Sequence, residues 1–323
     1  MSVPSPRISI VMPMRNAAAY VREALTSLLA QDWDDLEIVV VDDGSTDKSA
    51  SIVLSLNDPR IKLVPGPRKG IAAALNAGLA EATGELFCRC DADDWYPLNR
   101  LGRQARLLMD RRELGAVCGT FTMVTASGKR ITDQIWGTTP QQISDEIKSG
   151  VGRTHFCTFM VRMEIVRSLG GFRDYFIGTE DSDFILRLGE VCKVWYEPTL
   201  AYLYRLHGES ITHTQPSAQR KFLEKMMVEF QKQRLATGMD DLMRGNPPPL
   251  PVNLPANAER THDQVQHVLM GQAWKQHAAG QRMCAIKTGF RAVMSRPRTL
   301  NAWKSWLALV LKPSRPLKKA GAK

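Results

Sequence analysis

The chain has 323 residues and a formal net charge of +10, and 44% of its residues are hydrophobic and 24% are charged. This composition is typical of a globular protein and excludes a disordered or collagen-like chain. Because no stretch of about 18 apolar residues occurs and the N-terminus lacks the pattern of a signal peptide, we expect neither a membrane-spanning helix nor secretion.

The positive charge is concentrated at the C-terminus. Twelve of the 43 Lys and Arg residues, and none of the 33 Asp and Glu residues, lie between Gln264 and Lys323. A basic tail beside a nearly neutral body predicts a docking surface for an anionic partner and argues against a core that binds nucleic acid.

The six cysteines are scattered along the chain and predict free thiols. Cys88 and Cys90 lie close together, but their placement on one predicted strand does not suit a disulfide. No group of Cys and His residues has the spacing of a zinc site. The cysteines therefore indicate a reducing, cytosolic environment.

Strands alternate with helices over the first part of the chain. The expected strands are residues 7–12, 36–41, 61–64 and 85–90, and the expected helices are residues 17–30 and 71–82. The strand at 36–41 is almost entirely apolar, as expected for a strand that is covered on both faces. This alternation predicts an α/β protein with a Rossmann-like, doubly wound, mostly parallel sheet.

A polar segment follows each predicted strand. The four segments are Pro13–Asn16, Asp42–Asp47, Arg68–Gly70 and Asp91–Asp94. Because the carboxyl ends of parallel strands meet at one edge of a sheet, we expect these segments to form one ligand crevice. In the last segment, Asp91 and Asp93 flank a single residue. Two carboxylates in that position can bind a divalent cation, which suits the coordination of a diphosphate.

Several motifs occur in a definite order along the chain. They are SIVMPMRN from Ser9, LEIVVVDDGSTD from Leu36, GELFCRCDADDW from Gly84, GGF from Gly170, TED from Thr179 and YRLHGES from Tyr204. Together they resemble the motifs of the inverting glycosyltransferase family 2, whose members have the GT-A fold. The resemblance covers about residues 7–215 and leaves the last third of the chain unmatched.

By this resemblance, a nucleotide-sugar donor lies against the first three polar segments. Pro13 and Arg15 would line the nucleotide base, and Asp43 would form a hydrogen bond to it, at a uracil imide. The adjacent Asp42 is an alternative to Asp43. Arg68 would also approach the nucleotide. The resemblance therefore implies a nucleoside-diphosphate sugar, with a UDP-sugar favoured.

The resemblance also implies a divalent metal ion, Mn²⁺ or Mg²⁺, that bridges the donor diphosphate. Asp93 would bind the metal, and Asp91 would contact either the ribose or the metal. His207 in the YRLHGES motif is a further candidate ligand, because a neutral imidazole is a competent metal ligand. A structural role for His207 is the alternative.

Inversion at the anomeric carbon is a direct displacement, so a carboxylate must take the proton of the acceptor hydroxyl group. By the resemblance, Asp181 is this catalytic base, and Glu180 orients or contacts the acceptor. Alternatively, Asp181 and Asp183 cap the helix that follows. His155 is not assigned to the site, because a satisfied core histidine accounts for it equally well.

Motifs that the sequence lacks restrict the reaction further. No QxxRW motif of processive polysaccharide synthases follows TED, so we expect transfer of a single sugar to a glycan or lipid-linked saccharide. No GxGxxG motif follows the first strand, which argues against a dehydrogenase. A nucleotidyltransferase and a catalytically silent nucleotide-sugar-binding protein are the alternatives.

The C-terminal third predicts a separate region. We expect a catalytic domain at residues 1–215 and a helical, basic region at residues 216–323, with a proline-rich linker at 246–255. Near the C-terminus, apolar residues recur at helical spacing and are followed by lysines. The apolar residues are Trp303, Trp306, Leu307, Val310 and Leu311. This pattern favours an amphipathic helix on an anionic membrane surface, hence a cytoplasmic protein at the inner face of the cell membrane. Packing on its own domain or in a homodimer is the alternative.

Overall fold

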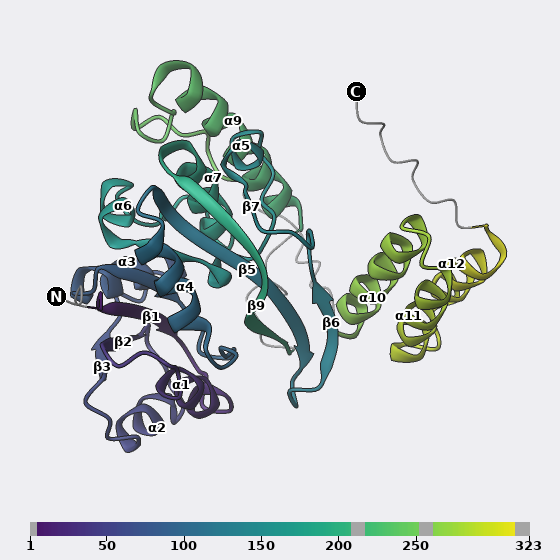
Figure 1. Cartoon of the computed structure of the whole chain (residues 1–323), viewed down its shortest axis with the longest axis horizontal. Helices are drawn as coiled ribbons and strands as arrows, with labels where there is room; N and C mark the ends of the chain where they lie inside the picture. Colours follow the sequence, from purple (N-terminus) through teal and green to yellow (C-terminus); the bar gives the residue numbers. More distant parts are fainter. Residues whose placement is uncertain (1–4, 208–216, 252–260, 314–323) are drawn as a thin grey trace. The chain divides into compact units, whose positions relative to one another are not determined.

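The computed structural model describes residues 5–207, 217–251 and 261–313 (Figure 1). The chain divides into two compact units. The first comprises Met1–Thr122, Asp133–Arg205 and Pro216–Pro255, and the second comprises Met123–Thr132, Leu206–Gln215 and Ala256–Lys323. The boundary after Pro255 therefore falls at the end of the proline-rich segment.

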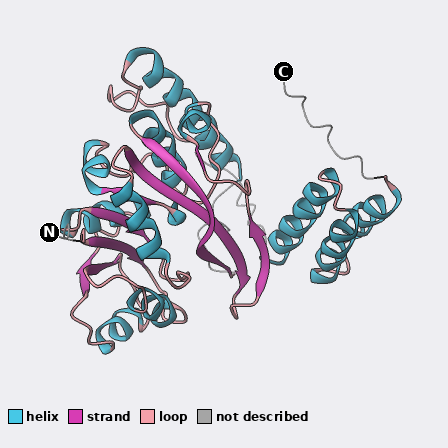
Figure 2. Cartoon of the chain, viewed as in Figure 1, coloured by secondary structure: helices cyan, strands magenta, loops and turns pink. Residues whose placement is uncertain are grey.

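Most of a nine-stranded mixed sheet belongs to the first unit (Figure 2). Its parallel part has the order β3-β2-β1-β4, formed by Ile61–Pro65, Leu36–Asp42, Ile8–Met14 and Leu86–Arg89. The sheet continues through β8, β5, β9 and β7, formed by Met160–Arg162, Leu114–Thr125, Lys193–Leu206 and Gln141–Gln142. β6 (Arg130–Gln134) pairs with β5. The parallel part confirms the predicted α/β sheet. The strands after β4 add an antiparallel part, since β8 runs antiparallel to both β4 and β5.

Helices pack against β1 and β2, whose consecutive residues are buried as expected for coverage on both faces. α3 (Ile71–Glu81) contacts β1 and β2, and a Cβ atom on its Gly78 would lie 2.4 Å from Val11. That distance makes glycine necessary for the close approach of helix and strand. α1 (Val21–Leu29) and α2 (Ser49–Ser55) contact each other. Gln31, just after α1, accepts hydrogen bonds from the first two backbone N–H groups of α4 (Arg100–Asp110).

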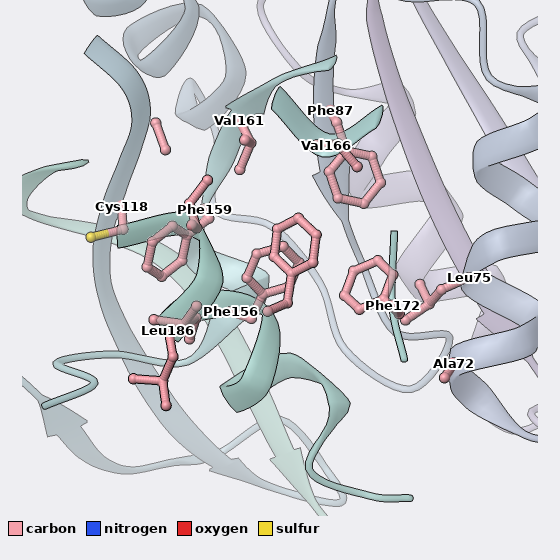
Figure 3. Packing of buried hydrophobic residues seen from close by; sticks show 14 of the residues in the cluster. Ala72, Leu75, Phe87, Cys118, Phe156, Phe159, Val161, Val166, Phe172 and Leu186 are labelled. Carbon is pink, nitrogen blue, oxygen red and sulfur yellow. The ribbon is translucent and has the colours of Figure 1, made fainter. Parts of the chain in front are cut away.

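A cluster of buried phenylalanines joins the end of β4 to α7 (Glu180–Val191). Phe156, in the 3-10 helix η1 (Phe156–Thr158), has its ring centroid 5.1 Å from that of Phe184 in α7. Phe172 lies 4.7 Å from Phe184, and Phe87 of β4 contacts both Phe156 and Phe172 (Figure 3). Because these rings pack without exposure to solvent, the cluster holds the first turn of α7 in place relative to β4 and η1. The shorter helices α5 (Ser144–Lys148) and α6 (Met163–Ser168) complete this part of the unit.

The first unit extends past the expected boundary at residue 215. α9 (Ser217–Thr237) places Leu223, Met227 and Phe230 in the same hydrophobic cluster as the phenylalanines. Buried ion pairs strengthen this attachment, because Asp240 pairs with Arg173 as well as with Arg234. The expected boundary therefore differs from the division in the structure, which assigns residues 216–255 to the first unit.

In the second unit, α10 (Thr261–Ala278), α11 (Arg282–Ser295) and α12 (Leu300–Leu311) pack on one another. One hydrophobic cluster between them consists of Ala273, Ala285 and Leu309, with Met270 and Trp274 packed against it. Leu269, Ala292, Val293 and Ala302 are also buried. The expected helical C-terminal region is thus present. Within the described ranges, no helix is both long and apolar enough to cross a membrane.

Candidate functional site

The carboxyl ends of β1 and β2 lie side by side, because Met14 is paired with Asp42 and the backbone N–H of Asp43 donates to Met14. The side chain of Asp43 is buried. Its two oxygens accept hydrogen bonds from the backbone N–H groups of Arg68, at 2.6 Å, and Gly70, at 3.1 Å. Asp43 therefore holds the loop after β3 against the loop after β2, as expected for segments that form one crevice.

Glycines permit this close approach of the two loops. A Cβ atom on Gly66 would lie 2.8 Å from the Cα atom of Asp43, so no other residue fits without moving the backbone. The side chain of Arg68 lies over Gly44, where a Cβ atom would meet its Nε atom at 3.1 Å. Arg68 itself is exposed and has a φ of 58°, in the left-handed region. The structure thus places the predicted Arg68 beside Asp43.

The segment after β1 joins the same edge. The side chain of Asn16 accepts a hydrogen bond from the backbone N–H of Thr46, and its own backbone N–H donates to Ser45. Pro13 is half-buried at the end of β1 and Arg15 is exposed. Asp42 accepts a hydrogen bond from the backbone N–H of Ser45.

Asp42 and Asp43 are therefore both engaged with backbone groups. Because each carboxylate oxygen has two lone pairs, either aspartate retains capacity to accept a hydrogen bond from a base. The choice between them stays a prediction.

Arg89, the last residue of β4, organises the acidic side of the site. Its guanidinium group forms two hydrogen bonds with Asp91, at 2.7 and 3.1 Å, and a third with Glu180, at 3.2 Å. The Arg89 side chain is 4% exposed and that of Asp91 is 19% exposed. Asp91 and Glu180 are 89 residues apart in sequence, yet both contact one buried cation. Arg89 therefore links the acidic turn after β4 to the first residue of α7.

The remaining carboxylates of the acidic turn face different surroundings. Asp94 is buried, and its Oδ1 atom accepts a hydrogen bond of 2.6 Å from the backbone N–H of Arg205. Burial raises the pKa of Asp94 well above its ordinary value, and the negative charges of Asp93 and Asp91 add to that rise. Asp93 is half-buried, and its backbone carbonyl accepts a hydrogen bond from Arg205. A concentration of negative charge of this kind favours a cation.

The first turn of α7 carries three acidic residues with different environments. Asp183 is fully buried and forms ion pairs with Arg173 and Arg187. Glu180 is also buried, and burial raises its pKa to about 7 although Arg89 acts in the opposite direction. Asp181 keeps 21% of its side chain exposed, and its Oδ1 atom accepts a hydrogen bond from the backbone N–H of Ser182.

Two expectations concern these residues: that Asp181 and Asp183 cap the helix, and that Glu180 orients or contacts the acceptor. The N-cap of α7 is Thr179, so neither Asp181 nor Asp183 caps the helix. The capping alternative is therefore wrong, because the helix begins one residue before Asp181. The burial of Glu180 turns its carboxyl group toward Arg89 rather than toward solvent.

His155 faces Asp181, although no sequence motif assigns it to the site. Its Nε2 atom lies 3.8 Å from Oδ2 of Asp181. Its Nδ1 atom accepts a hydrogen bond from the backbone N–H of Cys157, so the proton of the neutral ring is on Nε2, the nitrogen near the carboxylate. Burial lowers the pKa of His155, although the negative charge of Asp181 opposes this shift. Because the pKa is lowered, the ring is neutral near pH 7. The ring stacks on Tyr202 with an interplanar angle of 13°.

A signal in the sequence points to one of the two missed residues. Arg89 stands between two cysteines on an otherwise apolar strand, and a charge in such a place requires a partner of opposite charge. His155 has no comparable local signal, because its relation to Asp181 arises from the packing of η1 against α7.

The residues present fit a metal ion that is held jointly with a ligand. Among the residues that the structure describes, no group of three His, Cys, Asp or Glu side chains could hold a metal ion alone. Magnesium sites often combine one or two carboxylates with substrate phosphates, and Asp93 could supply such a carboxylate. Both oxygens of Asp91 already accept hydrogen bonds from Arg89. His207 follows β9 and belongs to the second unit, and the last residues of its YRLHGES motif lie outside the described ranges. Its role as a ligand stays a prediction.

Comparisons with known proteins agree with this geometry. The model of "Glycosyl transferase family 2" matches residues 9–170. An uncharacterized glycosyltransferase of Rickettsia typhi is 29% identical over 219 residues, which cover 65% of this chain and 67% of the relative. The structure of S. aureus TarS 1-349 in complex with UDP-GlcNAc superposes with a TM-score of 0.59 at 18% identity, covering 90% of this chain and 81% of the other.

A second solved structure is a mannosyltransferase from Pyrobaculum calidifontis in complex with GDP-Man and Mn²⁺. It has a TM-score of 0.51 at 21% identity, covering 96% of this chain and 81% of its own. These structural likenesses show the GT-A fold. The family match favours a glycosyltransferase over the nucleotidyltransferase alternative. The chain belongs to glycosyl transferase family 2 and is a glycosyltransferase.

Proposed function

We propose that this glycosyltransferase transfers one sugar, with inversion, from a nucleoside-diphosphate sugar to a glycan or lipid-linked saccharide, with a divalent metal ion bound at the donor diphosphate. The observation that carries the proposal is the pair of contacts made by Arg89. They hold Asp91, on the proposed donor side, next to the first turn of α7, where Asp181 faces His155. A donor group and a base must be neighbours for a direct displacement.

The donor side consists of the loops held together by Asp43. The nucleotide base would lie against Pro13 and Arg15 and donate a hydrogen bond to Asp43, with Arg68 nearby. The fold neighbours that bind UDP-GlcNAc and GDP-Man support a nucleoside-diphosphate sugar as the donor class. We propose a UDP-sugar, because the carboxylate of Asp43 complements the N–H of a uracil imide.

Asp93 is the proposed protein ligand of Mn²⁺ or Mg²⁺, and Asp91 the proposed contact of the ribose. Both oxygens of Asp91 already accept hydrogen bonds from Arg89, which lowers their availability to a metal ion. A bound divalent ion would neutralise the negative charge that develops on the leaving diphosphate. The Mn²⁺ in the mannosyltransferase neighbour supports a metal of this class.

Asp181 is the proposed base that takes the proton of the acceptor hydroxyl group. It is partly exposed, whereas the carboxyl groups of Glu180 and Asp183 are buried against arginine side chains. We propose that Glu180 acts on Asp91 through Arg89, as a positioning residue. His155 is a second positioning residue, because its Nε2 atom lies 3.8 Å from Oδ2 of Asp181 and needs only a small shift to form a hydrogen bond.

The proposed cellular setting is the cytoplasm, at the inner face of the membrane, where a lipid-linked acceptor is accessible. All six cysteines are free in the structure, and four of them are buried, as suits a reducing compartment.

Two substitutions at the site test the proposal. Asp93→Asn is expected to abolish the metal-dependent stabilisation by UDP-sugars in a thermal-shift panel of UDP-, GDP- and dTDP-sugars with and without Mn²⁺. Asp181→Asn is expected to retain this stabilisation and to lower sugar transfer or donor hydrolysis by about 10³-fold or more, because the base is lost. Asp34→Asn, an exposed turn residue, is the matched control. Full activity of either site variant contradicts the proposed roles, and absence of any nucleotide-dependent shift contradicts the donor class.

A further inference from the structure

The second unit exposes an unusual amount of apolar surface for its size. Its three helices bury seven of their described hydrophobic residues, four of which are alanines: Leu269, Ala273, Ala285, Ala292, Val293, Ala302 and Leu309. Six large apolar side chains remain outside, with exposed fractions between 43% and 77%: Met283, Phe290, Met294, Leu300, Leu307 and Leu311. They are six of the fifteen exposed large hydrophobic residues in the described part of the chain. Such a concentration marks an interaction site.

Three of these residues lie along one side of α11, and the other three lie along one side of α12. On α11, Met283 is followed at intervals of seven and four residues by Phe290 and Met294, and on α12 Leu300 is followed at the same intervals by Leu307 and Leu311. Residues at these intervals share one face of a helix. Each helix therefore carries one exposed apolar stripe.

The two stripes belong to neighbouring helices. Phe290 of α11 contacts the ring of Trp306 in α12, with 5.6 Å between ring centroids. At the other end, Nη2 of Arg282 donates a hydrogen bond of 2.5 Å to the carbonyl of Val310. The helices thus lie together along their length, and we call their joint exposed surface, formed by the six residues, the α11–α12 face.

This face differs from the one that the sequence pattern of α12 suggests. Trp306 turns inward, since its Nε1–H group donates to the carbonyl of Ile286 and its Cδ1 atom would lie 3.0 Å from a Cβ atom on Gly289. The stripe that faces solvent instead consists of Leu300, Leu307 and Leu311. Part of the apolar pattern of α12 therefore packs within its own unit, and part is left for a partner.

Basic residues lie on the same two helices as the α11–α12 face. Lys287 on α11 and Lys304 on α12 are exposed, whereas Arg291 on α11 donates a hydrogen bond to the carbonyl of Ile131. No Asp or Glu residue occurs from Gln264 to the C-terminus. A second copy of the chain would bring like charges together, which is unfavourable, whereas an anionic surface complements both the charge and the apolar side chains.

We propose that the α11–α12 face docks the protein on an anionic phospholipid bilayer. Leu300, Leu307 and Leu311 enter the boundary between headgroups and acyl chains, and the side chains of Lys287 and Lys304 contact the negatively charged headgroups. The inference agrees with the proposed lipid-linked acceptor, but vesicle binding requires neither donor nor metal. Its failure is therefore distinguishable from failure of the proposed catalysis.

Vesicle co-sedimentation with the full-length protein tests the proposal. The expected result is binding to vesicles of phosphatidylcholine with about 30% phosphatidylglycerol, and little binding to pure phosphatidylcholine, because the basic residues need anionic headgroups. Raising the salt concentration from about 50 mM to 500 mM is expected to weaken binding, because salt screens exposed charges. Equal binding to both vesicle types, or none to either, overturns the proposal.

Two variants separate the apolar contribution from the electrostatic one. The double variant Leu307→Asn/Leu311→Asn is expected to bind anionic vesicles at least about tenfold more weakly, because each leucine loses its burial in lipid. Lys287→Gln/Lys304→Gln is expected to weaken binding and to reduce its salt dependence. The matched control is Leu54→Asn/Leu235→Asn, which replaces two leucines of the first unit that are 66% and 54% exposed.

Light scattering of the wild type and of Leu307→Asn/Leu311→Asn tests whether the face binds a second copy of the chain instead of a membrane. If the wild type is a dimer and Leu307→Asn/Leu311→Asn is a monomer with unchanged vesicle binding, the face joins two copies and the membrane proposal is wrong. An unchanged oligomeric state together with reduced vesicle binding supports it. Thermal melts confirm folding, since substitutions at exposed positions usually change stability by less than about 0.5 kcal/mol.

Discussion

Replacement of Glu180 by glutamine tests the electrostatics of the candidate site in depth. The Glu180 side chain is 4% exposed, its Oε1 atom accepts a hydrogen bond from Arg89, and its Oε2 atom has no hydrogen-bond partner among the described residues. Burial raises its pKa from 4.5 to about 7, opposed by Arg89 and reinforced by the negative charge of Asp181. The charged form of Glu180 is therefore unfavourable in the folded protein.

The sign of the pH dependence follows from this shift. A carboxyl group whose pKa is raised in the folded state stabilises the fold below its unfolded pKa, and this contribution is lost as the pH rises through the folded pKa. The window runs from pH 4.5 to about pH 7. A shift of this size corresponds to about 3 kcal/mol at full ionisation. Glutamine stays neutral and therefore does not lose this stability as the pH rises. Glu180→Gln is expected to become more stable relative to the wild type as the pH rises from 5 to 8.

Thermal melts at pH 5, 6, 7 and 8 in metal-free buffer measure this difference. For a domain of this size, about 3 kcal/mol corresponds to a change of roughly 6–12 °C in the difference between the two melting temperatures. Glu229→Gln, at an exposed position of α9, is the control and is expected to show a constant difference. The reasoning is refuted if the difference between Glu180→Gln and wild type is the same at pH 5 and pH 8.

Two further substitutions address the positioning of groups in the site. His155→Phe keeps the stack on Tyr202 but removes the Nε2–H group near Asp181, so kcat is expected to fall about 10- to 100-fold while the donor KM stays within about twofold. A rise in the donor KM without a change in kcat would contradict the assignment. Gly66→Ala forces the backbone next to Asp43 to move and is expected to abolish the thermal shift with UDP-sugars, whereas Gly152→Ala, which meets no atom within 4 Å, is expected to retain it. An unchanged shift in Gly66→Ala would separate this loop from donor binding.

The elements that the sequence predicts well are those with local signals. The apolar runs at residues 7–12 and 36–41 form β1 and β2, because a nearly continuous apolar strand is stable only when both faces are covered. The acidic turn follows β4 as expected. These features depend on residues close together in the chain, so spacing and composition are sufficient to predict them.

The contacts that organise the site depend on residues far apart in the chain. Arg89 contacts Glu180 across 91 positions, and His155 faces Asp181 because the phenylalanine cluster packs η1 against α7. Sequence spacing indicates which residues carry charge but not which charges are buried together. The resemblance therefore identifies Glu180 and Asp181 as one motif, whereas their different burial separates a positioning role from that of a base.

In the second unit, too, sequence periodicity predicts the helices but not which of their residues are buried. The helical periodicity of the last segment predicts α12, but it does not show that Trp306 turns inward and leaves Leu307 and Leu311 exposed. Likewise, the helical pattern after residue 216 predicts α9 but not its burial in the core of the first unit.

The sequence by itself determined the α/β class, the resemblance to family 2 glycosyltransferases and the placement of polar segments after strands, because these follow from periodicity and from motifs in fixed order. Only the tertiary structure decided which carboxylates pair with Arg89, which one stays accessible beside His155, and which side of α12 remains exposed. Burial and pairing decide the pKa and accessibility of each group, and both arise from packing between segments that are distant in the chain.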